Sequence, residues 1–235
     1  MIAPAVPPCV LVTGASGVLG SAVARGFSEK GFKVLGTGCR TAPPFQPSIQ
    51  LDLTLESEIR RLEPWLGSQT DHVDVLVQCV GGTRDGLISK MNTEDWSRTL
   101  AVNLKSAFMI SRVLLPRMMK QRSGHLIFVG SWGGRVGRIG QANYAAAKAG
   151  LLGLTQSIAR EYAARNVLAN CVVPGVFKSP MTDALSPEAL ERLWDGAAMR
   201  QFADLGETAD FIVHLASMRA VTGQVFQLDG RIAPS

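Results

Sequence analysis

The sequence has little that would place the protein in a membrane or at a metal centre. No segment approaches the roughly 18 uninterrupted apolar residues that cross a bilayer. The first ten residues, MIAPAVPPCV, lack the basic start of a secretion signal. The four cysteines form no Cys-x-x-Cys pair and the three histidines are scattered, so neither set predicts a metal site. We therefore expect a cytoplasmic protein with reduced thiols, no bound metal and no membrane attachment.

Charge is also sparse and widely spread. Charged residues make up 18% of the chain, and the net charge is +5. The basic residues do not gather into the kind of stripe that binds nucleic acid, so no nucleic-acid partner is expected. The positive balance still permits an acidic protein partner or a phosphorylated cofactor. The 46% hydrophobic content predicts a globular protein with a sizeable core.

Strand-like and helix-like segments alternate along the 235 residues. Apolar segments predict seven strands, at 9–13, 32–37, 48–53, 73–80, 125–130, 167–173 and 224–230. Helices are predicted at 18–30, at 56–66, from an N-cap at Thr93 to Phe108 and around Tyr144, with a loop and short helices over 176–217. Buried strands that alternate with helices are typical of a parallel sheet covered on both faces. We predict one α/β domain, residues 1–235, built on a Rossmann-type doubly wound parallel sheet of about seven strands.

A glycine-rich turn follows the first predicted strand. Residues 13–20 read TGASGVLG, with glycines at 14, 17 and 20, and a predicted helix follows. The glycines allow a tight turn, and the start of a helix presents unpaired N–H groups and the positive end of the helix dipole. Because it lies between a strand and a helix, the turn predicts the pyrophosphate site of a dinucleotide. A purely structural turn is the alternative.

The end of the second predicted strand bears on which dinucleotide binds. An acidic residue there usually bonds the ribose hydroxyls of NAD, but this sequence reads GTGCR and has Arg40 instead. An arginine can pair with a 2′-phosphate, so NADPH is favoured and NADH remains possible. A solvated surface arginine is the alternative. Asp52, after the third strand, fits either an adenine contact or a turn.

A tyrosine and a lysine lie four residues apart in QANYAAAKAG, residues 141–150. The three alanines between them favour a helix, and positions i and i+4 lie on one face of a helix. A fixed positive charge near a phenol favours the phenolate, so Tyr144 and Lys148 fit a general acid and base. On this stretch alone, a packed ring beside a solvated amine is the simpler interpretation.

The combined features resemble the short-chain dehydrogenase/reductase family over nearly the whole chain. They are the glycine-rich turn, Asn103 in a long helix, Ser131 after the fifth strand, Tyr144 with Lys148, and Pro174-Gly175 after the sixth strand. The segments TRDGL, GQANYAAAKAGLLGLTQSIARE and VVPG are most similar to 3-oxoacyl-[acyl-carrier-protein] reductases. The resemblance implies NADPH-dependent reduction of a 3-oxoacyl thioester, on a carrier protein or coenzyme A, in fatty-acid or polyketide biosynthesis.

The resemblance also assigns catalysis to four residues. Tyr144 would donate a proton to the carbonyl oxygen of the substrate, and Ser131 would hydrogen-bond the same oxygen. Lys148 would favour the phenolate of Tyr144 and hold the nicotinamide ribose. Asn103 would hold a water in a proton relay to Lys148. With all four residues present, catalysis replaces simple packing as the favoured interpretation of Tyr144 and Lys148.

Cofactor contacts are expected from the ends of the strands. The residues concerned are Gly14, Ser16, Gly17, Val18, Leu19, Gly20, Arg40, Asp52, Leu53, Gly81, Tyr144, Lys148, Pro174 and Gly175. Two departures from the family pattern lie on this side. Gln78-Cys79-Val80-Gly81 stands where the family commonly has Asn-Asn-Ala-Gly, and Gly17 lies one place earlier than the usual second glycine. Both departures concern cofactor affinity rather than the hydride chemistry.

Substrate contacts are expected from a lid at about 176–200. The apolar side chains Phe177, Met181, Leu185, Leu193 and Met199 suit an acyl chain or a polyketide, with ordinary helix packing as the alternative. Trp132 is bulkier than the small aliphatic residue expected beside Ser131, and we expect it to narrow or flatten the pocket.

Two kinds of protein partner follow from the resemblance. Arg122 and Arg165 match positions at which the resembling reductases dock an acidic acyl carrier protein, with solvated surface charge as the alternative. Family members are commonly tetramers packed through their long helices. The apolar residues Leu151, Leu152 and Leu154 are compatible with a homotetramer or a dimer.

Other functions remain open at this point. One keeps the chemistry and changes the substrate to another ketone or alcohol, for example a cyclic or aromatic one. Another is a non-catalytic dinucleotide sensor, which the altered segment 78–80 favours and the intact catalytic residues oppose. The glycine spacing is also similar to that of extended family members that act on sugar nucleotides, but these need a larger C-terminal region.

Overall fold

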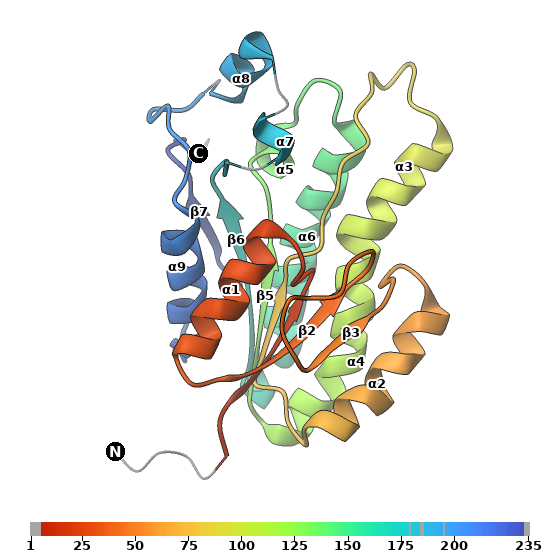
Figure 1. Ribbon diagram of the computed structural model, residues 1–235, viewed down its shortest axis with the longest axis vertical. Coiled ribbons are helices and arrows are strands. Elements are labelled where there is room, and N and C mark those ends of the chain that lie inside the picture. The colour runs from red at the N-terminus through yellow and green to blue at the C-terminus, as the bar shows by residue number, and fades with distance from the viewer. Residues whose placement is uncertain (1–5, 179, 184–185, 195, 233–235) are drawn as a thin grey trace.

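Seven parallel strands form one sheet in the order β3-β2-β1-β4-β5-β6-β7, which confirms the predicted doubly wound α/β fold (Figure 1). This computed structural model describes residues 6–178, 180–183, 186–194 and 196–232. The strands are β1 (Cys9–Thr13), β2 (Lys33–Gly38), β3 (Ser48–Gln50), β4 (Val75–Gln78), β5 (Gly124–Val129), β6 (Val167–Pro174) and β7 (Val225–Leu228). The strand order reverses at β1, between β2 and β4, so the crevice in which such sheets bind ligands lies at the carboxyl ends of β1 and β4.

Helices cover both faces of the sheet (Figure 1). One face carries α1 (Val18–Glu29) and α9 (Leu205–Ser217), and the other carries α2 (Glu56–Gln69), α4 (Ser106–Gln121) and α6 (Ala142–Tyr162). Shorter elements are α3 (Thr93–Leu100), α5 (Gly133–Val136), α7 (Pro180–Asp183), α8 (Pro187–Leu193), the π-helical turn η1 (Ala101–Lys105) and the 3-10 turn η2 (Ala163–Arg165). The chain thus builds three layers, with the sheet in the middle.

Two apolar clusters lie on the two faces of the sheet, and β1 contributes to both. Cys9 and Leu11 pack with residues of α2, α4 and α6, whereas Val10 and Val12 pack with residues of α1 and α9. Successive side chains of a strand point to opposite faces, so a strand covered on both sides is apolar throughout. This is why the buried strands read as continuous apolar segments.

Several predicted boundaries are wrong. The strands predicted at 48–53 and 73–80 cover only 48–50 and 75–78, because turns and loops continue the apolar segments beyond the last ladder bonds. The predicted N-cap Thr93 is the first helical residue, and Asn92 caps α3 by accepting a 2.7 Å hydrogen bond from the Asp95 N–H. Both residue types are good caps, so the sequence does not separate them. The short helices expected up to residue 217 include one of 13 residues, α9.

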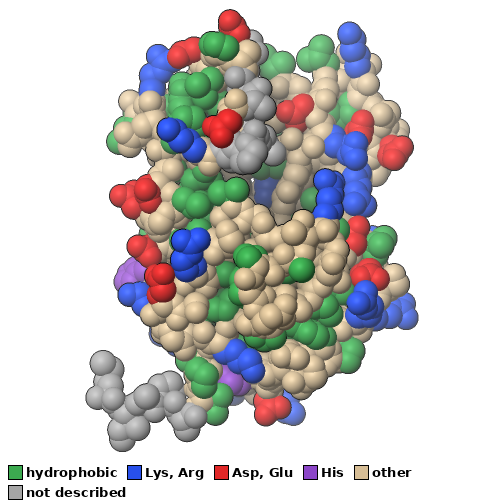
Figure 2. Space-filling view, viewed as in Figure 1, with side chains coloured by type: hydrophobic (Ala, Val, Ile, Leu, Met, Phe, Trp, Pro, Cys, Tyr) green, Lys and Arg blue, Asp and Glu red, His purple; other side chains and the backbone are tan. Residues whose placement is uncertain are grey.

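Charge on the surface is mixed. Basic and acidic side chains are interspersed over the face shown in Figure 2. Among the residues that the structure describes, no helix has the length and apolar character to cross a membrane. Within the same residues, no group of three or more His, Cys, Asp or Glu side chains could hold a metal ion.

Candidate active site

The four predicted catalytic residues come from three regions at the carboxyl edge of the sheet. Ser131 follows β5, and Tyr144 and Lys148 lie in the first two turns of α6. Asn103 lies in η1, the π-helical turn that joins α3 to α4. Single π-helical turns within longer helices are frequent at functional sites. The packing of α6 beside α3 and η1 therefore brings Asn103 and Tyr144, which are 41 positions apart, to the same end of the molecule.

Lys148 is a buried cation at the centre of this region. It is 3% exposed, and its Nζ donates a 2.8 Å hydrogen bond to the Val129 carbonyl at the end of β5. A methyl group added at Gly81 would lie 3.1 Å from Asn103 Oδ1 and 3.4 Å from Lys148 Nζ. The ammonium, the amide and the backbone after β4 therefore converge at position 81, where a Cβ would crowd both side chains.

Asn103 is fully buried and held by three hydrogen bonds. Its Nδ2 donates to the carbonyls of Thr99, at 2.9 Å, and Gly82, at 2.7 Å, and its Oδ1 accepts from the Gly82 N–H at 3.3 Å. These bonds tie the π-helical turn to the loop after β4. These bonds therefore hold the side-chain oxygen Oδ1 of Asn103 on the side that faces Lys148.

Tyr144 lies on the same face of α6 as Lys148, as the spacing predicts. Lys148 Nζ is 5.6 Å from the centroid of the Tyr144 ring. The Tyr144 ring is partly exposed, so a ligand can reach it. Ser131 Oγ accepts a 3.3 Å hydrogen bond from the Gly133 N–H, which leaves the hydroxyl hydrogen available to another acceptor.

Asn143 positions the start of α6 and was not identified from the sequence. It is fully buried, and its Oδ1 accepts a 2.7 Å hydrogen bond from the Tyr144 N–H. Its Nδ2 donates to the Arg84 carbonyl, at 2.9 Å, and to Thr99 Oγ1, at 3.0 Å. The turn that carries Tyr144 is therefore tied to α3. The sequence signal that could have indicated this role is an asparagine directly before the tyrosine.

The glycine-rich turn leads from β1 into α1. Gly14 has a φ of +66°, which glycine adopts without strain, and its carbonyl accepts a 2.9 Å hydrogen bond from the Gly17 N–H. A methyl group at Gly20 would lie 2.2 Å from the Gly14 carbonyl oxygen. Gly17 is the N-cap of α1, so no side chain caps the helix, and its first turn has no acidic residue. The first N–H groups of α1 are suited to an anion.

Ser16, Val18 and Leu19 border that turn. Ser16 and Val18 are exposed and Leu19 is partly buried, so the start of α1 is accessible from solvent. A pyrophosphate can approach these N–H groups without displacing a side chain of the first turn. The donor set therefore fits the pyrophosphate of a dinucleotide.

Gln78, in the segment that departs from the family pattern, is part of a buried polar network. Thr13 Oγ1 donates to Gln78 Oε1 in a short hydrogen bond, and Gln78 Nε2 donates to Ser106 Oγ at 3.0 Å. Ser106 in turn donates to the Val102 carbonyl at 2.6 Å. All three side chains are at most 1% exposed. The departure is therefore accommodated: Gln78 joins β1 and β4 to the start of α4.

Cys79 follows Gln78 and lies near Lys148. Burial raises the pKa of the Cys79 thiol to about 12, although the positive charge of Lys148 acts in the opposite direction. The thiol is therefore protonated near neutral pH and is not a reactive thiolate.

Arg40 lies two residues beyond β2, and Asp52 lies two residues beyond β3. Arg40 is exposed. Asp52 Oδ1 accepts hydrogen bonds from Thr54 N at 2.9 Å and Thr54 Oγ1 at 2.6 Å, and its Oδ2 lies 3.4 Å from Arg98 Nη2. Partial burial of Asp52 acts to raise its pKa, but the Thr54 hydrogen bonds and the Arg98 charge outweigh burial and lower the pKa. This geometry favours the turn interpretation of Asp52. The Leu53 side chain is 4% exposed and packs in the core.

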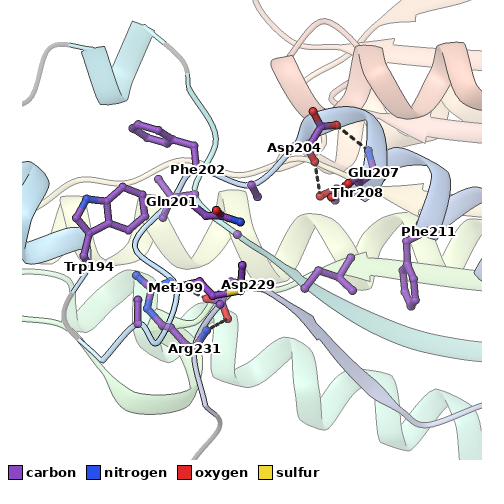
Figure 3. A pocket seen from close by; sticks show the side chains of 16 residues that line it. Trp194, Met199, Gln201, Phe202, Asp204, Glu207, Thr208, Phe211, Asp229 and Arg231 are labelled. Atoms are coloured by element: carbon purple, nitrogen blue, oxygen red, sulfur yellow. Dashed lines mark hydrogen bonds and ion pairs between the residues drawn. The ribbon is translucent and has the colours of Figure 1, made fainter.

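The chain beyond β6 meets the segment before α9. Gly175 follows Pro174, and a methyl group there would lie 2.6 Å from Ala203 Cβ. A cavity of about 550 Å³ lies between this segment, the start of α9 and the end of β7 (Figure 3). Its walls include Val176, Trp194, Met199, Phe202, Phe211 and Arg231. Within the predicted lid, Leu185 and the side chain of Met181 lie outside the described residues.

The two predicted docking arginines lie together, 43 positions apart in the sequence. Arg122 ends α4, and its carbonyl accepts a 3.1 Å hydrogen bond from Asn166 Nδ2, directly after Arg165. An open hollow beside them is lined by Pro116, Met119, Lys120 and Arg165. The side chains of Lys120 and Arg165 therefore line one hollow at the ends of α4 and α6, and the backbone of Arg122 lies beside Asn166. The predicted oligomer contact Leu151 is 1% exposed and belongs to the chain's own core.

The comparison with known proteins decides the family. The family model described as short chain dehydrogenase matches residues 8–190. The chain belongs to the short-chain dehydrogenase family. The predicted resemblance is thereby confirmed, and this short-chain dehydrogenase is an oxidoreductase that uses a nicotinamide dinucleotide.

Curated relatives match this short-chain dehydrogenase over nearly its full length. The 3-oxoacyl-[acyl-carrier-protein] reductase FabG of Vibrio cholerae is 38% identical over 231 residues, which are 94% of this chain and 95% of that protein. The protein of the same name from Escherichia coli is 36% identical, with the same coverage. Nodulation protein G of Rhizobium sp. is 37% identical over 95% of this chain and 96% of its own.

Proposed function

We propose that this protein reduces the 3-oxo group of an acyl thioester to a 3-hydroxy group with NADPH. The observation that carries the proposal is the convergence of Lys148, Asn103 and Gly81 beside the Tyr144 ring. The similarity to proteins named 3-oxoacyl-[acyl-carrier-protein] reductase, along nearly the whole chain, supports the substrate class. A lid formed by residues 176–200 would cover the acyl thioester.

A nicotinamide dinucleotide bound at this site would supply the hydride that the carbonyl carbon of the substrate accepts. Tyr144 donates its phenolic proton to the carbonyl oxygen, so the product is the alcohol. Ser131 donates a hydrogen bond to the same oxygen, for which its hydroxyl hydrogen is available because its oxygen accepts from Gly133. The buried ammonium of Lys148 stabilises the phenolate that remains on Tyr144. Asn103 holds the relay that returns the proton.

Binding of NADPH is assigned to two groups. The uncapped start of α1 would hold the pyrophosphate, as the absence of acidic residues in that first turn favours. Arg40 would pair with the 2′-phosphate, since β2 leads into Gly38-Cys39-Arg40 with no acid to bond the ribose hydroxyls of NAD.

The partner at the other end of the molecule is an acidic acyl carrier protein. Lys120, Arg122 and Arg165 would attract it. We also propose a homo-oligomer packed through α4 and α6. Because Leu151 is internal, the contact between subunits would instead involve exposed side chains such as Phe108, which is 48% exposed on α4.

The test is NADPH oxidation by the purified protein with a 3-oxoacyl thioester, on coenzyme A and on carrier protein, with NADH in parallel. We expect turnover with NADPH, a higher KM for NADH and a higher kcat/KM for the carrier-bound thioester. Turnover of a cyclic or aromatic ketone alone would change the substrate class. NADPH binding without reduction of any carbonyl would favour the sensor function.

A further inference from the structure

A buried ion pair lies just beyond β7, outside the catalytic residues. Arg231 Nη1 lies 2.6 Å from Asp229 Oδ2, and the two side chains are 4% and 3% exposed. Arg231 Nη2 donates a short hydrogen bond to the Leu193 carbonyl at the end of α8. Figure 3 shows Arg231 directed at Asp229 in the wall of the cavity. An ion pair buried to this degree is held in a single geometry, because either charge alone would be costly.

The other side of the Arg231 guanidinium faces Trp132. Its Cζ lies 5.6 Å from the centroid of the Trp132 ring. Arg231 Nε is buried and finds no hydrogen-bond partner among the residues that the structure describes, and the guanidinium lies over the indole ring. A cation within about 6 Å of an indole centroid is attracted to its face, and desolvation strengthens that attraction. The indole next to Ser131 is therefore held by Arg231.

A second set of hydrogen bonds holds the loop that follows Ser131. Arg135 Nη1, in α5, donates to Gln227 Oε1 at 3.2 Å. Gln227 Nε2 donates to Asp229 Oδ1, at 2.7 Å, and to the Arg231 carbonyl, at 2.8 Å. The loop after Ser131 is thus attached to the end of β7 at two points, Trp132 and Arg135, and both attachments lead to Asp229.

The pair also lies beside the predicted lid. The N–H groups of Ala198 and Met199 donate to the Gly230 carbonyl, at 2.8 and 3.1 Å, and so hold the outer wall of the cavity against the segment that carries Arg231. Arg231 lines the cavity, whereas Trp132 does not. Arg231 therefore contacts both the cavity and the indole beside Ser131.

We propose that Arg231 is a positioning residue for Trp132, and that the two form a fixed wall that limits the length of the acyl group attached to the reacting carbonyl. The proposal rests on the proposed function and adds its substrate class: short-chain 3-oxoacyl thioesters. If Trp132 is made smaller or loses its contact with Arg231, a longer acyl chain would be able to enter the cavity.

The experiment compares kcat/KM for short, medium and long 3-oxoacyl thioesters in the wild type, Trp132→Val, Arg231→Lys and the double variant. A lysine keeps the charge that Asp229 needs but cannot lie flat on the indole. We expect the ratio of long-chain to short-chain kcat/KM to rise about tenfold in each single variant, mostly through KM for the long chain. In the double variant this ratio should be no higher than in either single variant. Trp132→Phe, which keeps a ring face, should remain close to the wild type.

Arg200→Lys is the matched control, because Arg200 follows Met199 in the segment bonded to Gly230 but forms an exposed ion pair with Glu191. If the ratio of long-chain to short-chain kcat/KM is unchanged in Trp132→Val, Trp132 does not limit the length of the acyl group. If the increases of the two single variants multiply in the double variant, Arg231 does not act through Trp132. If the wild type reduces another ketone series instead, the proposed function fails, and the same ratio is measured within that series. A protein that reduces no carbonyl overturns both proposals.

Discussion

At the scale of single residues, burial separates Lys148 from the solvated lysines of the chain. A buried ammonium is costly unless hydrogen bonds compensate it. The Val129 carbonyl accepts one such bond, and Asn103 and the Tyr144 ring lie close by. A hydrocarbon side chain would fill this position at lower cost to folding. The proposed role of Lys148, which is to stabilise the phenolate of Tyr144 one helical turn away, would account for the charge.

Replacing Tyr144 by phenylalanine removes the proposed proton donor and changes little else. We expect kcat for the 3-oxoacyl thioester to fall by about 10²–10⁴-fold, the usual contribution of a general acid. The dissociation constant for NADPH, measured by fluorescence titration, should change much less. Tyr162→Phe is the control, because it alters the other tyrosine of the chain at the far end of the same helix. A Tyr144→Phe enzyme with wild-type kcat would remove Tyr144 from the mechanism.

Replacing Arg40 by alanine tests the cofactor preference. A charge-assisted hydrogen bond contributes about 1.5–3 kcal/mol, so the KM for NADPH should rise by at least about tenfold. The KM for NADH should stay the same, because NADH has no 2′-phosphate. Arg60→Ala, an exposed arginine on α2, provides the control. Equal effects of Arg40→Ala on both cofactors would contradict the assignment.

At the scale of elements, the Thr13–Gln78–Ser106 network joins two strands to a helix. Gln78→Leu leaves the Thr13 hydroxyl buried without its acceptor, and an unsatisfied buried polar group costs about 1–3 kcal/mol. We expect the free energy of unfolding in urea to fall by that amount. Gln156→Leu, on the exposed face of α6, should leave it nearly unchanged. A stability loss no greater than in this control would mean that the network contributes nothing.

The order of the elements could be predicted from the sequence because buried strands read as apolar segments and the alanine-rich stretch favours α6. The predicted i,i+4 geometry of Tyr144 and Lys148 also follows from the helix alone. The π-helical turn at Asn103, the bonds of Asn143 and the role of Gln78 were not predicted. Each depends on polar partners from other elements, which local patterns do not specify.

The same limit applies at the ends of helices and to contacts between distant residues. The N-cap of α3 is Asn92 rather than Thr93, because local composition does not distinguish between two good capping residues. The contact of Trp132 with Arg231 joins positions 99 residues apart. The sequence shows that Trp132 is bulky, but only the tertiary structure shows what holds it.

At the scale of the whole molecule, stability should depend on His125 in β5. Asn170 Nδ2 lies 2.8 Å from His125 Nε2, where it donates to the neutral ring. Burial, with the nearby charge of Arg219 adding to it, lowers the pKa of His125 from 6.5 to about 4. The unfolded chain therefore binds a proton between about pH 6.5 and pH 4 that the folded chain does not. Stability is complete above that window and falls as the pH decreases through it.

We expect the free energy of unfolding to decrease by roughly 1–2 kcal/mol between pH 7 and pH 5, where few carboxylates titrate. Urea unfolding at the two pH values measures this change. The decrease should be smaller in His125→Gln, which cannot be protonated. His214→Gln, at an exposed position on α9, should retain it. A wild-type stability that is independent of pH in this range would contradict the prediction.

The length of α6 has a consequence for how substrate would be delivered. The helix has 21 residues, about 30 Å at 1.5 Å per residue, with Tyr144 near one end and Arg165 just beyond the other. A carrier held at Arg165 therefore lies far from the Tyr144 of the same chain, so in an oligomer its cargo would enter the site of a neighbouring subunit. Mixing Arg165→Glu and Tyr144→Phe chains should then restore carrier-dependent turnover that neither variant has alone. One subunit would receive the carrier, and another would carry out the reduction.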